Sequence, residues 1–118
     1  LLRPALTEVA VPAARGMAAY ARGDYAGAYP ELARATPRLQ EIGGSHAQRD
    51  LFVQTWLDTL LRTGHADEAA AELADRAEAR PTVPHGFRLL QRAYDDIGDG
   101  AKAAEAGATA ERLQAAMG

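Results

Sequence analysis

The chain has 118 residues, with 13 Lys and Arg against 16 Asp and Glu, a formal net charge of −3, three His and no Cys. This length fits one small domain, the missing cysteines exclude disulfides and thiolate chemistry, and the charge lacks the basic surplus typical of nucleic-acid or anionic-membrane binding. Alanine makes up about a quarter of the chain and aromatic residues only 6%, which disfavours a β-sandwich or barrel and predicts closely approaching helices.

Three glycine-centred turns divide the chain into six predicted helices. Gly23, Gly64 and Gly98 each follow a helical run and precede a polar residue, the pattern of a C′ glycine before the N-cap of the next helix. The first helix is predicted to begin at Pro12, because proline in a first turn loses no hydrogen bond. The predicted helices span residues 12–22, 25–42, 45–64, 66–80, 83–97 and 101–117.

The second predicted helix contains two prolines, Pro30 and Pro37. Each removes a backbone hydrogen bond from the helical ladder. We therefore expect a bend or break near Tyr29 or Thr36.

The third predicted helix opens with a capping signal. Ser45 is followed three residues later by Gln48, so each side chain can accept a hydrogen bond from the backbone N–H of the other. A second interpretation of this segment is an anion site in which His46, Arg49 and Asp50 use the free N–H groups of a helix N-terminus. The structural interpretation is favoured, because a capping box already satisfies those groups.

Apolar residues at helical spacing define the predicted inner faces of three helices. They are Leu51, Phe52, Trp56, Leu57, Leu60 and Leu61 in the third helix, Phe87, Leu90, Tyr94 and Ile97 in the fifth, and Ala103, Ala106, Ala110, Leu113 and Met117 in the sixth.

The turns also define an internal repeat. The three turn glycines lie 41 and 34 residues apart, and each is followed five residues later by alanine, namely Ala28, Ala69 and Ala103. A helix–turn–helix unit of about 34 residues is the length of a tetratricopeptide repeat (TPR), in which small residues let two helices approach closely. The chain resembles a TPR array, with Gly16 at the small position of a first helix. Other matching positions are Tyr94 and Pro81, whereas Leu57 and Gln91 stand at the small position of the other two units, which are degenerate.

This pattern predicts an all-α fold of three antiparallel helix pairs stacked as a TPR-like right-handed α-solenoid. The approximate units are residues 5–42, 45–80 and 83–117 of a single domain. The segment 42–52, Ile-Gly-Gly-Ser-His-Ala-Gln-Arg-Asp-Leu-Phe, is similar to the corresponding stretch of the tetratricopeptide repeat protein 38 family and its bacterial relatives. The resemblance implies the C-terminal repeats of a longer chain, and it transfers no catalytic residues.

A stacked array predicts a binding groove along the first helix of each pair. Arg88 and Arg92 are four residues apart on one face, a spacing that lets two guanidinium groups grip one carboxylate. The alternative is a solvated helix face with Asp95 or Asp96 as partners. The candidate groove residues are Tyr20, Gln54, Asp58, Arg88, Arg92 and Asp95.

Candidate chemistry elsewhere is sparse. The histidines His46, His65 and His85 fall in three different linkers without metal-ligand spacing, and the single serine, Ser45, serves as a cap. We therefore predict no catalytic residue, cofactor or metal, and a non-catalytic scaffold that binds a peptide or protein. The alternative is an accessory or oligomerisation domain of a larger enzyme, with an independent small enzyme third.

The chain ends carry apolar stripes, which a neighbouring repeat would cover in a longer array. The stripes are Leu1, Leu2, Ala5, Leu6 and Val9 at one end and Leu113, Ala116 and Met117 at the other. They can pack on the body, on parent sequence outside this chain, or on a second copy as a homodimer through the end hairpins. No signal-peptide or bilayer-spanning pattern occurs in the chain, so we expect a cytoplasmic location without membrane or nucleic-acid partners.

Overall fold

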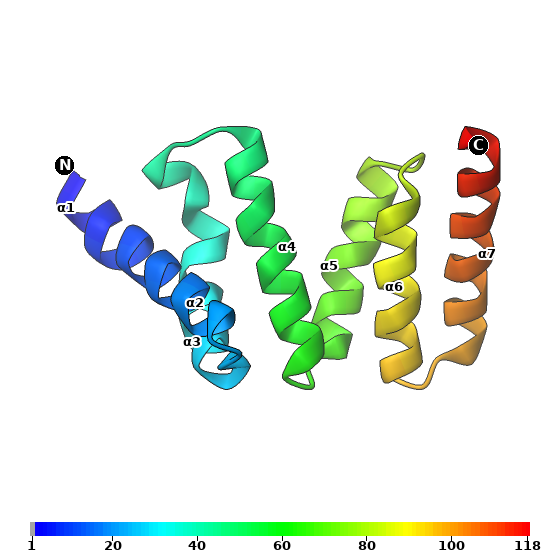
Figure 1. The fold of residues 1–118 in the computed structure, drawn as a ribbon, viewed down its shortest axis with the longest axis horizontal. Coiled ribbons are helices and arrows are strands. Elements are labelled where there is room, and N and C mark those ends of the chain that lie inside the picture. Colours follow the sequence, from blue (N-terminus) through cyan, green and yellow to red (C-terminus); the bar gives the residue numbers. More distant parts are fainter. Residues whose placement is uncertain (1) are drawn as a thin grey trace. The chain divides into compact units, whose positions relative to one another are not determined.

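The computed structural model describes residues 2–118, and within this range the fold is all-α, without strands (Figure 1). The predictions for Leu1 and for the side chain of Leu2 lie outside the described residues. In chain order the elements are α1 (Leu2–Ala5), η1 (Leu6–Ala10), α2 (Val11–Ala21), α3 (Tyr25–Ala35), η2 (Thr36–Ile42), α4 (His46–Arg62), α5 (Ala66–Ala79), α6 (Pro84–Asp96) and α7 (Gly100–Met117). None of these helices is both long and apolar enough to cross a membrane.

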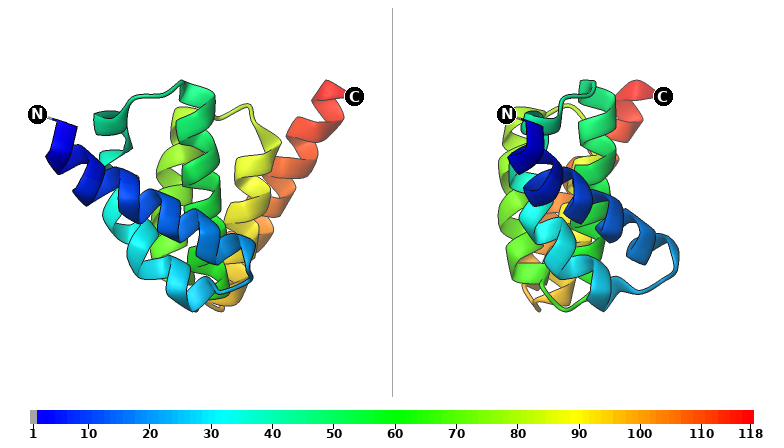
Figure 2. Two further views of the ribbon diagram at one scale, coloured as in Figure 1. Left: turned by 60° about the vertical axis from the view of Figure 1, so that its left-hand side comes forward. Right: turned by 90° about the vertical axis from the view of Figure 1, so that its left-hand side faces the viewer.

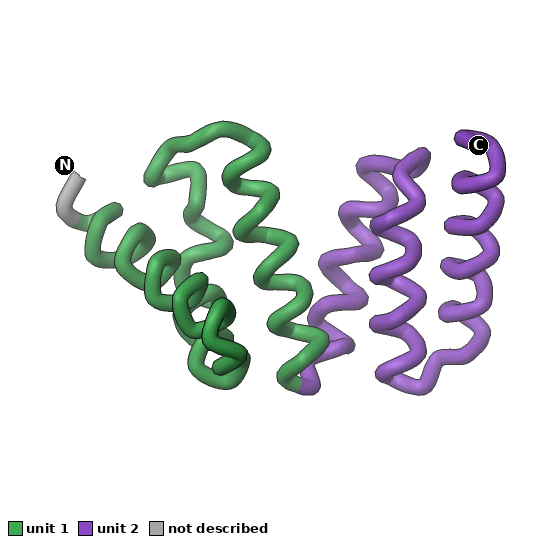
Figure 3. Tube along the Cα trace, in the orientation of Figure 1, with its two compact units in different colours: residues 1–63 green, residues 64–118 purple. Residues whose placement is uncertain are grey.

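The chain divides into two compact units, Leu1–Thr63 and Gly64–Gly118 (Figure 3). In the first unit α2 packs against α3, and both contact α4; in the second α6 packs against α5 and α7. Figure 2 shows α2 and α3 lying side by side. The boundary falls inside the predicted pair 45–80, and the division into three repeat units stays a prediction.

The first helical run begins earlier than predicted. It starts at Leu2 and reaches α2 through η1, a π-helical turn in which the Val11 N–H bonds to the Leu6 carbonyl five residues back. Pro12 follows directly and has no N–H, so the wider turn sacrifices no hydrogen bond at that position. Helix α2 begins at Val11 with Pro12 in its first turn, within one residue of the prediction, but the residues before it are also helical, which the prediction missed.

The predicted break in the second helix is confirmed at Thr36. There α3 gives way to η2, a 3₁₀-helix with non-helical dihedral angles at Arg38 (φ −120°, ψ 16°). Pro37 stands in its first turn, where a missing N–H costs least. Pro30 lies inside α3 without ending it.

Two turns of the chain have the same backbone geometry. Gly23 (φ +79°) and Gly98 (φ +81°) adopt the left-handed conformation that closes a helix. The N–H groups of Asp24 and Asp99 reach back five residues to carbonyls of the preceding helix, as in a Schellman motif. Each aspartate then caps the next helix by accepting a hydrogen bond from the N–H three residues on.

Small residues mark the close helix contacts. Ala28 and Ala69 are fully buried and Ala103 nearly so. A methyl group added at Gly16 would lie 2.6 Å from the side chain of Leu32, which is itself fully buried. Helices α2 and α3 therefore touch where α2 has no side chain.

The predicted inner faces are correct in the helix centres and wrong near three helix ends. Trp56, Leu57, Leu60, Leu61, Leu90, Ala103, Ala106 and Ala110 are buried. Phe52, Phe87, Tyr94 and Leu113 are partly buried. Leu51, Ile97 and Met117 are 59%, 45% and 68% exposed, because Leu51 lies in the first turns of α4, Ile97 is the C-cap of α6 and Met117 is the last residue of α7.

The end stripes also divide between core and surface. Val9 is fully buried in a cluster with Ala13, Ala35 and Leu39, whereas Leu6 is 53% exposed. The apolar stripe at the N-terminal end is therefore only partly covered by the body of the first unit.

Candidate functional site

Two of the predicted groove residues meet in the first unit. The Tyr20 hydroxyl on α2 donates a 2.6 Å hydrogen bond to Asp58 Oδ2 on α4, across 38 residues of sequence. Both side chains are half-buried. The contact joins the two faces that the repeat pattern assigns to a groove.

Arg62 and Tyr25 complete this polar cluster, which we call the Tyr20–Asp58 cluster. Arg62 Nε donates to Asp58 Oδ2 at 2.7 Å, and its guanidinium carbon lies 4.8 Å from the centre of the Tyr25 ring. The Tyr20 and Tyr25 rings meet edge to face, with centroids 5.5 Å apart. Asp58 therefore accepts from a phenol and a guanidinium, and the Tyr25 ring contacts both of these donor side chains.

The cluster shifts the acidity of its members. The hydrogen bond to Asp58 raises the pKa of Tyr20, and burial and the negative charge of Asp58 add to the shift. The hydrogen bond to Asp58 likewise raises the pKa of Arg62. Both shifts favour the protonated forms of Tyr20 and Arg62, whose hydrogen bonds are directed at Asp58.

Sequence reasoning missed Arg62 and Tyr25. Asp58 and Arg62 are four residues apart on one helix, a spacing that favours an ion pair. That signal was readable from the sequence. The Tyr25 contact had no such signal, because it depends on how α3 packs against α4.

The other predicted residue of the first unit, Gln54, is half-buried one turn before Asp58 on α4. Trp56 is 7% exposed, and its ring stacks on Tyr29 of α3 with centroids 5.4 Å apart. Trp56 thus belongs to the helix packing of this unit.

In the second unit, the predicted groove residues Arg88, Arg92 and Asp95 are all exposed on α6. Arg88 Nη2 donates to Gln114 Oε1 on α7 at 3.5 Å, a long contact at the surface. Both arginines are therefore accessible to a ligand.

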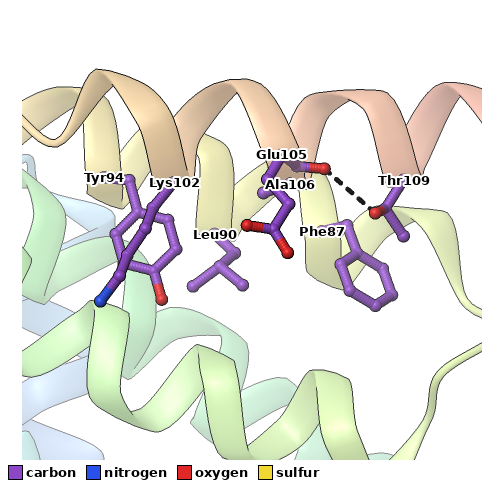
Figure 4. Close-up of a pocket in the computed structure, with 7 residues that line it drawn as sticks. All are labelled: Phe87, Leu90, Tyr94, Lys102, Glu105, Ala106 and Thr109. Atoms are coloured by element: carbon purple, nitrogen blue, oxygen red, sulfur yellow. Dashed lines mark hydrogen bonds between the residues drawn. The ribbon is translucent and has the colours of Figure 1, made fainter.

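A small cavity of about 250 Å³ lies between α6 and α7 (Figure 4). Phe87, Leu90 and Tyr94 of α6 and Lys102 and Glu105 of α7 line it, with their side chains projecting to the same side of the two helices. Lys102 Nζ lies 5.7 Å from the centre of the Tyr94 ring. The lining combines apolar and charged side chains and includes none of the predicted groove residues.

The segment around Ser45 has the capping-box geometry. Gln48 N–H donates to Ser45 Oγ at 3.1 Å, and Ser45 N–H donates to Gln48 Oε1 at 2.8 Å. Arg49 contacts the Gly44 carbonyl and the His46 ring. The N–H groups of Ser45 and Gln48 and the guanidinium of Arg49 are therefore engaged within the segment itself.

The described part of the chain, residues 2–118, holds no group of three or more His, Asp or Glu side chains placed to bind a metal ion. No protein-family model matches the chain. No solved structure matches it significantly. The functional interpretation therefore depends on the local geometry of the two units.

Proposed function

We propose that this chain is a TPR-like array, with three antiparallel helix pairs stacked as a right-handed α-solenoid, and that it acts as a non-catalytic scaffold for a peptide or protein. The observation that carries the proposal is the repeated turn. Gly23 and Gly98 share one φ value within 2° and one pattern of backbone hydrogen bonds. Asp24 and Asp99 then cap the following helices in the same way. Recurrence of one turn at corresponding positions is typical of repeat proteins.

The resemblance to the tetratricopeptide repeat protein 38 family belongs to this proposal, together with a cytoplasmic location. In such an array the first helix of each pair faces the ligand. The corresponding polar side chains are Tyr20, Gln54, Asp58, Arg88, Arg92 and Asp95.

The ligand chemistry follows from the arginines. Arg88 and Arg92 are exposed on one face of α6, and guanidinium groups bind carboxylates through paired, charge-assisted hydrogen bonds. The proposed ligand is therefore a peptide that offers a carboxylate, either at its C-terminus or on an acidic side chain.

A random peptide library, in free-carboxylate and amidated forms, tests this proposal. The double variant Arg88→Ala/Arg92→Ala is expected to bind selected peptides at least about tenfold more weakly, because hydrogen bonds to charged groups contribute roughly 1.5–3 kcal/mol each. The matched control is Arg80→Ala/Arg112→Ala, which removes the same charge from exposed positions. Equal binding by wild type and the first double variant rejects the arginine clamp, and a library that yields no binder rejects the scaffold function.

The second candidate function is an accessory or oligomerisation domain of a larger enzyme. The exposure of Leu6, Ile42 and Leu51 in the first unit favours it, because clustered apolar surface commonly marks an interface. Mass measured against concentration by light scattering tests this second candidate, because an oligomerisation domain must self-associate, whereas peptide binding neither requires nor excludes self-association.

A further inference from the structure

Two neighbouring cavities open on the first unit beside η2. One, of about 400 Å³, is lined by Leu39, Leu51 and Phe52. The other, of about 520 Å³, is lined by Ala5, Leu6 and Ala10. Ile42 and Gly43 line both, so the cavities adjoin along one surface, which we call the end groove.

The end groove leaves large apolar side chains exposed to water. Leu6, Ile42 and Leu51 are 53%, 37% and 59% exposed. The groove also reaches the buried cluster of Val9, Ala13, Ala35 and Leu39, because Leu39 lines one of its two cavities. A surface that continues a core outward, with large aliphatic side chains in water, is typical of an interface that another chain covers.

Charges of opposite sign mark the two halves of the groove. In the half lined by Leu6, the lining residue Glu41 pairs with Arg38 at 2.6 Å, and Arg38 also pairs with Glu8 at 2.9 Å. Two carboxylates therefore share one guanidinium, so these three side chains together carry one excess negative charge. Glu41 lines this half of the groove, and the hydrogen bonds from Arg38 keep its pKa below the ordinary value.

The other half carries a positive charge. Arg49 lines it and contacts the Gly44 carbonyl at 3.0 Å and His46 Nδ1 at 3.3 Å. Within residues 2–118 it forms no ion pair with a carboxylate. Arg49 therefore retains charge that a partner can neutralise.

We infer that the end groove is a two-fold interface with a second copy of this chain. In such an interface the same patch serves both partners, so every contact between two different residues occurs twice, once in each direction. An acidic half and a basic half on either side of Ile42 make the patch complementary to itself. A two-fold axis near Ile42 brings Glu41 of each copy toward Arg49 of the other, while the leucines of both copies become buried.

Charge reversal tests this pairing. Glu41→Arg and Arg49→Glu each create two like-charge contacts in a homodimer, and each is expected to weaken dimerisation by about tenfold or more. An equimolar mixture of the two variants is expected to restore the dimer, because both contacts in the heterodimer are then Arg against Glu. Sedimentation equilibrium over a concentration series measures each case, and circular dichroism checks that the variants are helical.

The controls make the same charge changes elsewhere. Glu111→Arg and Arg112→Glu alter exposed residues of α7, and they are expected to leave dimerisation unchanged. Leu51→Ser is expected to weaken the dimer without a change of charge.

A wild-type chain that stays monomeric at every concentration overturns the inference, as does a dimer that both charge reversals and Leu51→Ser leave unchanged. A mixture that fails to restore association overturns the Glu41–Arg49 pairing. The inference does not depend on peptide binding, so either proposal can fail alone.

Discussion

The α2–α3 and α6–α7 helix pairs share one turn and differ in how their helices touch. In the first pair Gly16 of α2 receives the side chain of Leu32, which is fully buried. In the last pair Gly107 of α7 lies against the half-buried amide of Gln91, beside a row of buried alanines. The turn therefore sets the pairing of the helices, and the contact between them can be built from either a large apolar or a polar side chain.

The two contact glycines offer the strongest test of this difference. Gly16→Ala is expected to destabilise the first unit by roughly 1–3 kcal/mol, because the added methyl group meets a leucine that has no room to move. Gly107→Ala is expected to be neutral or to stabilise by up to about 1 kcal/mol, because Gln91 can swing toward water and alanine favours a helix.

Hydrogen exchange of the amides of each helix pair measures both effects separately. Gly86→Ala is the matched control, since a methyl group at Gly86 meets no atom within 4 Å. Equal destabilisation by the variants at Gly16 and Gly107 would contradict this difference, because it would mean that the two helix contacts are equally tight.

Substitutions of the turn glycines test whether the turns of the two helix pairs are equivalent. Gly23→Ala and Gly98→Ala are each expected to cost about 1–2 kcal/mol, because both residues have φ near +80° and neither position is crowded. The two costs are expected to agree closely, since the hydrogen bonds around the turns are the same. Thermal unfolding of the two variants, measured beside Gly86→Ala, gives the comparison. A cost confined to one turn would contradict the equivalence of the pairs.

The first unit also has a smaller contribution to its stability that depends on pH. The raised pKa of Tyr20 means that its hydrogen bond to Asp58 stabilises the fold fully below about pH 10, the ordinary tyrosine value. This contribution is lost as the pH rises through the pKa of the folded state. Asp58→Asn is expected to return the Tyr20 pKa toward its ordinary value, and the absorbance of tyrosinate at 295 nm measures it.

The variant Tyr20→Phe identifies which step of the tyrosinate absorbance titration belongs to Tyr20. The step that Tyr20→Phe removes is expected to move to lower pH in Asp58→Asn. A step that stays in place would mean that Asp58 does not hold the phenol proton in solution.

Local chemistry could be predicted from the sequence, and long-range placement could not. The cap formed by Ser45 and Gln48 depends on residues three apart, and the structure has the expected hydrogen bonds. The exposure of Leu51 could not be read from helical periodicity, because a period assigns a residue to a face and does not say how far the neighbouring helix extends. The Tyr20–Asp58 contact was likewise inaccessible, although both residues were singled out, since it joins positions 38 residues apart.

The π-helical turn at Leu6–Ala10 gives the N-terminal helical run an inserted residue. In an α-helix each residue advances the direction of its side chain by about 100° around the axis, so the wider turn acts as a phase shift between the residues before it and those after it. The stripe that begins at Ala5 therefore does not continue in line with the stripe through Val9 and Ala13. At the present chain length, a regular α-helix over Leu6–Ala10 would rotate the residues before the turn by about 100° relative to those after it, so the π-helical geometry of this segment determines which side chains face water.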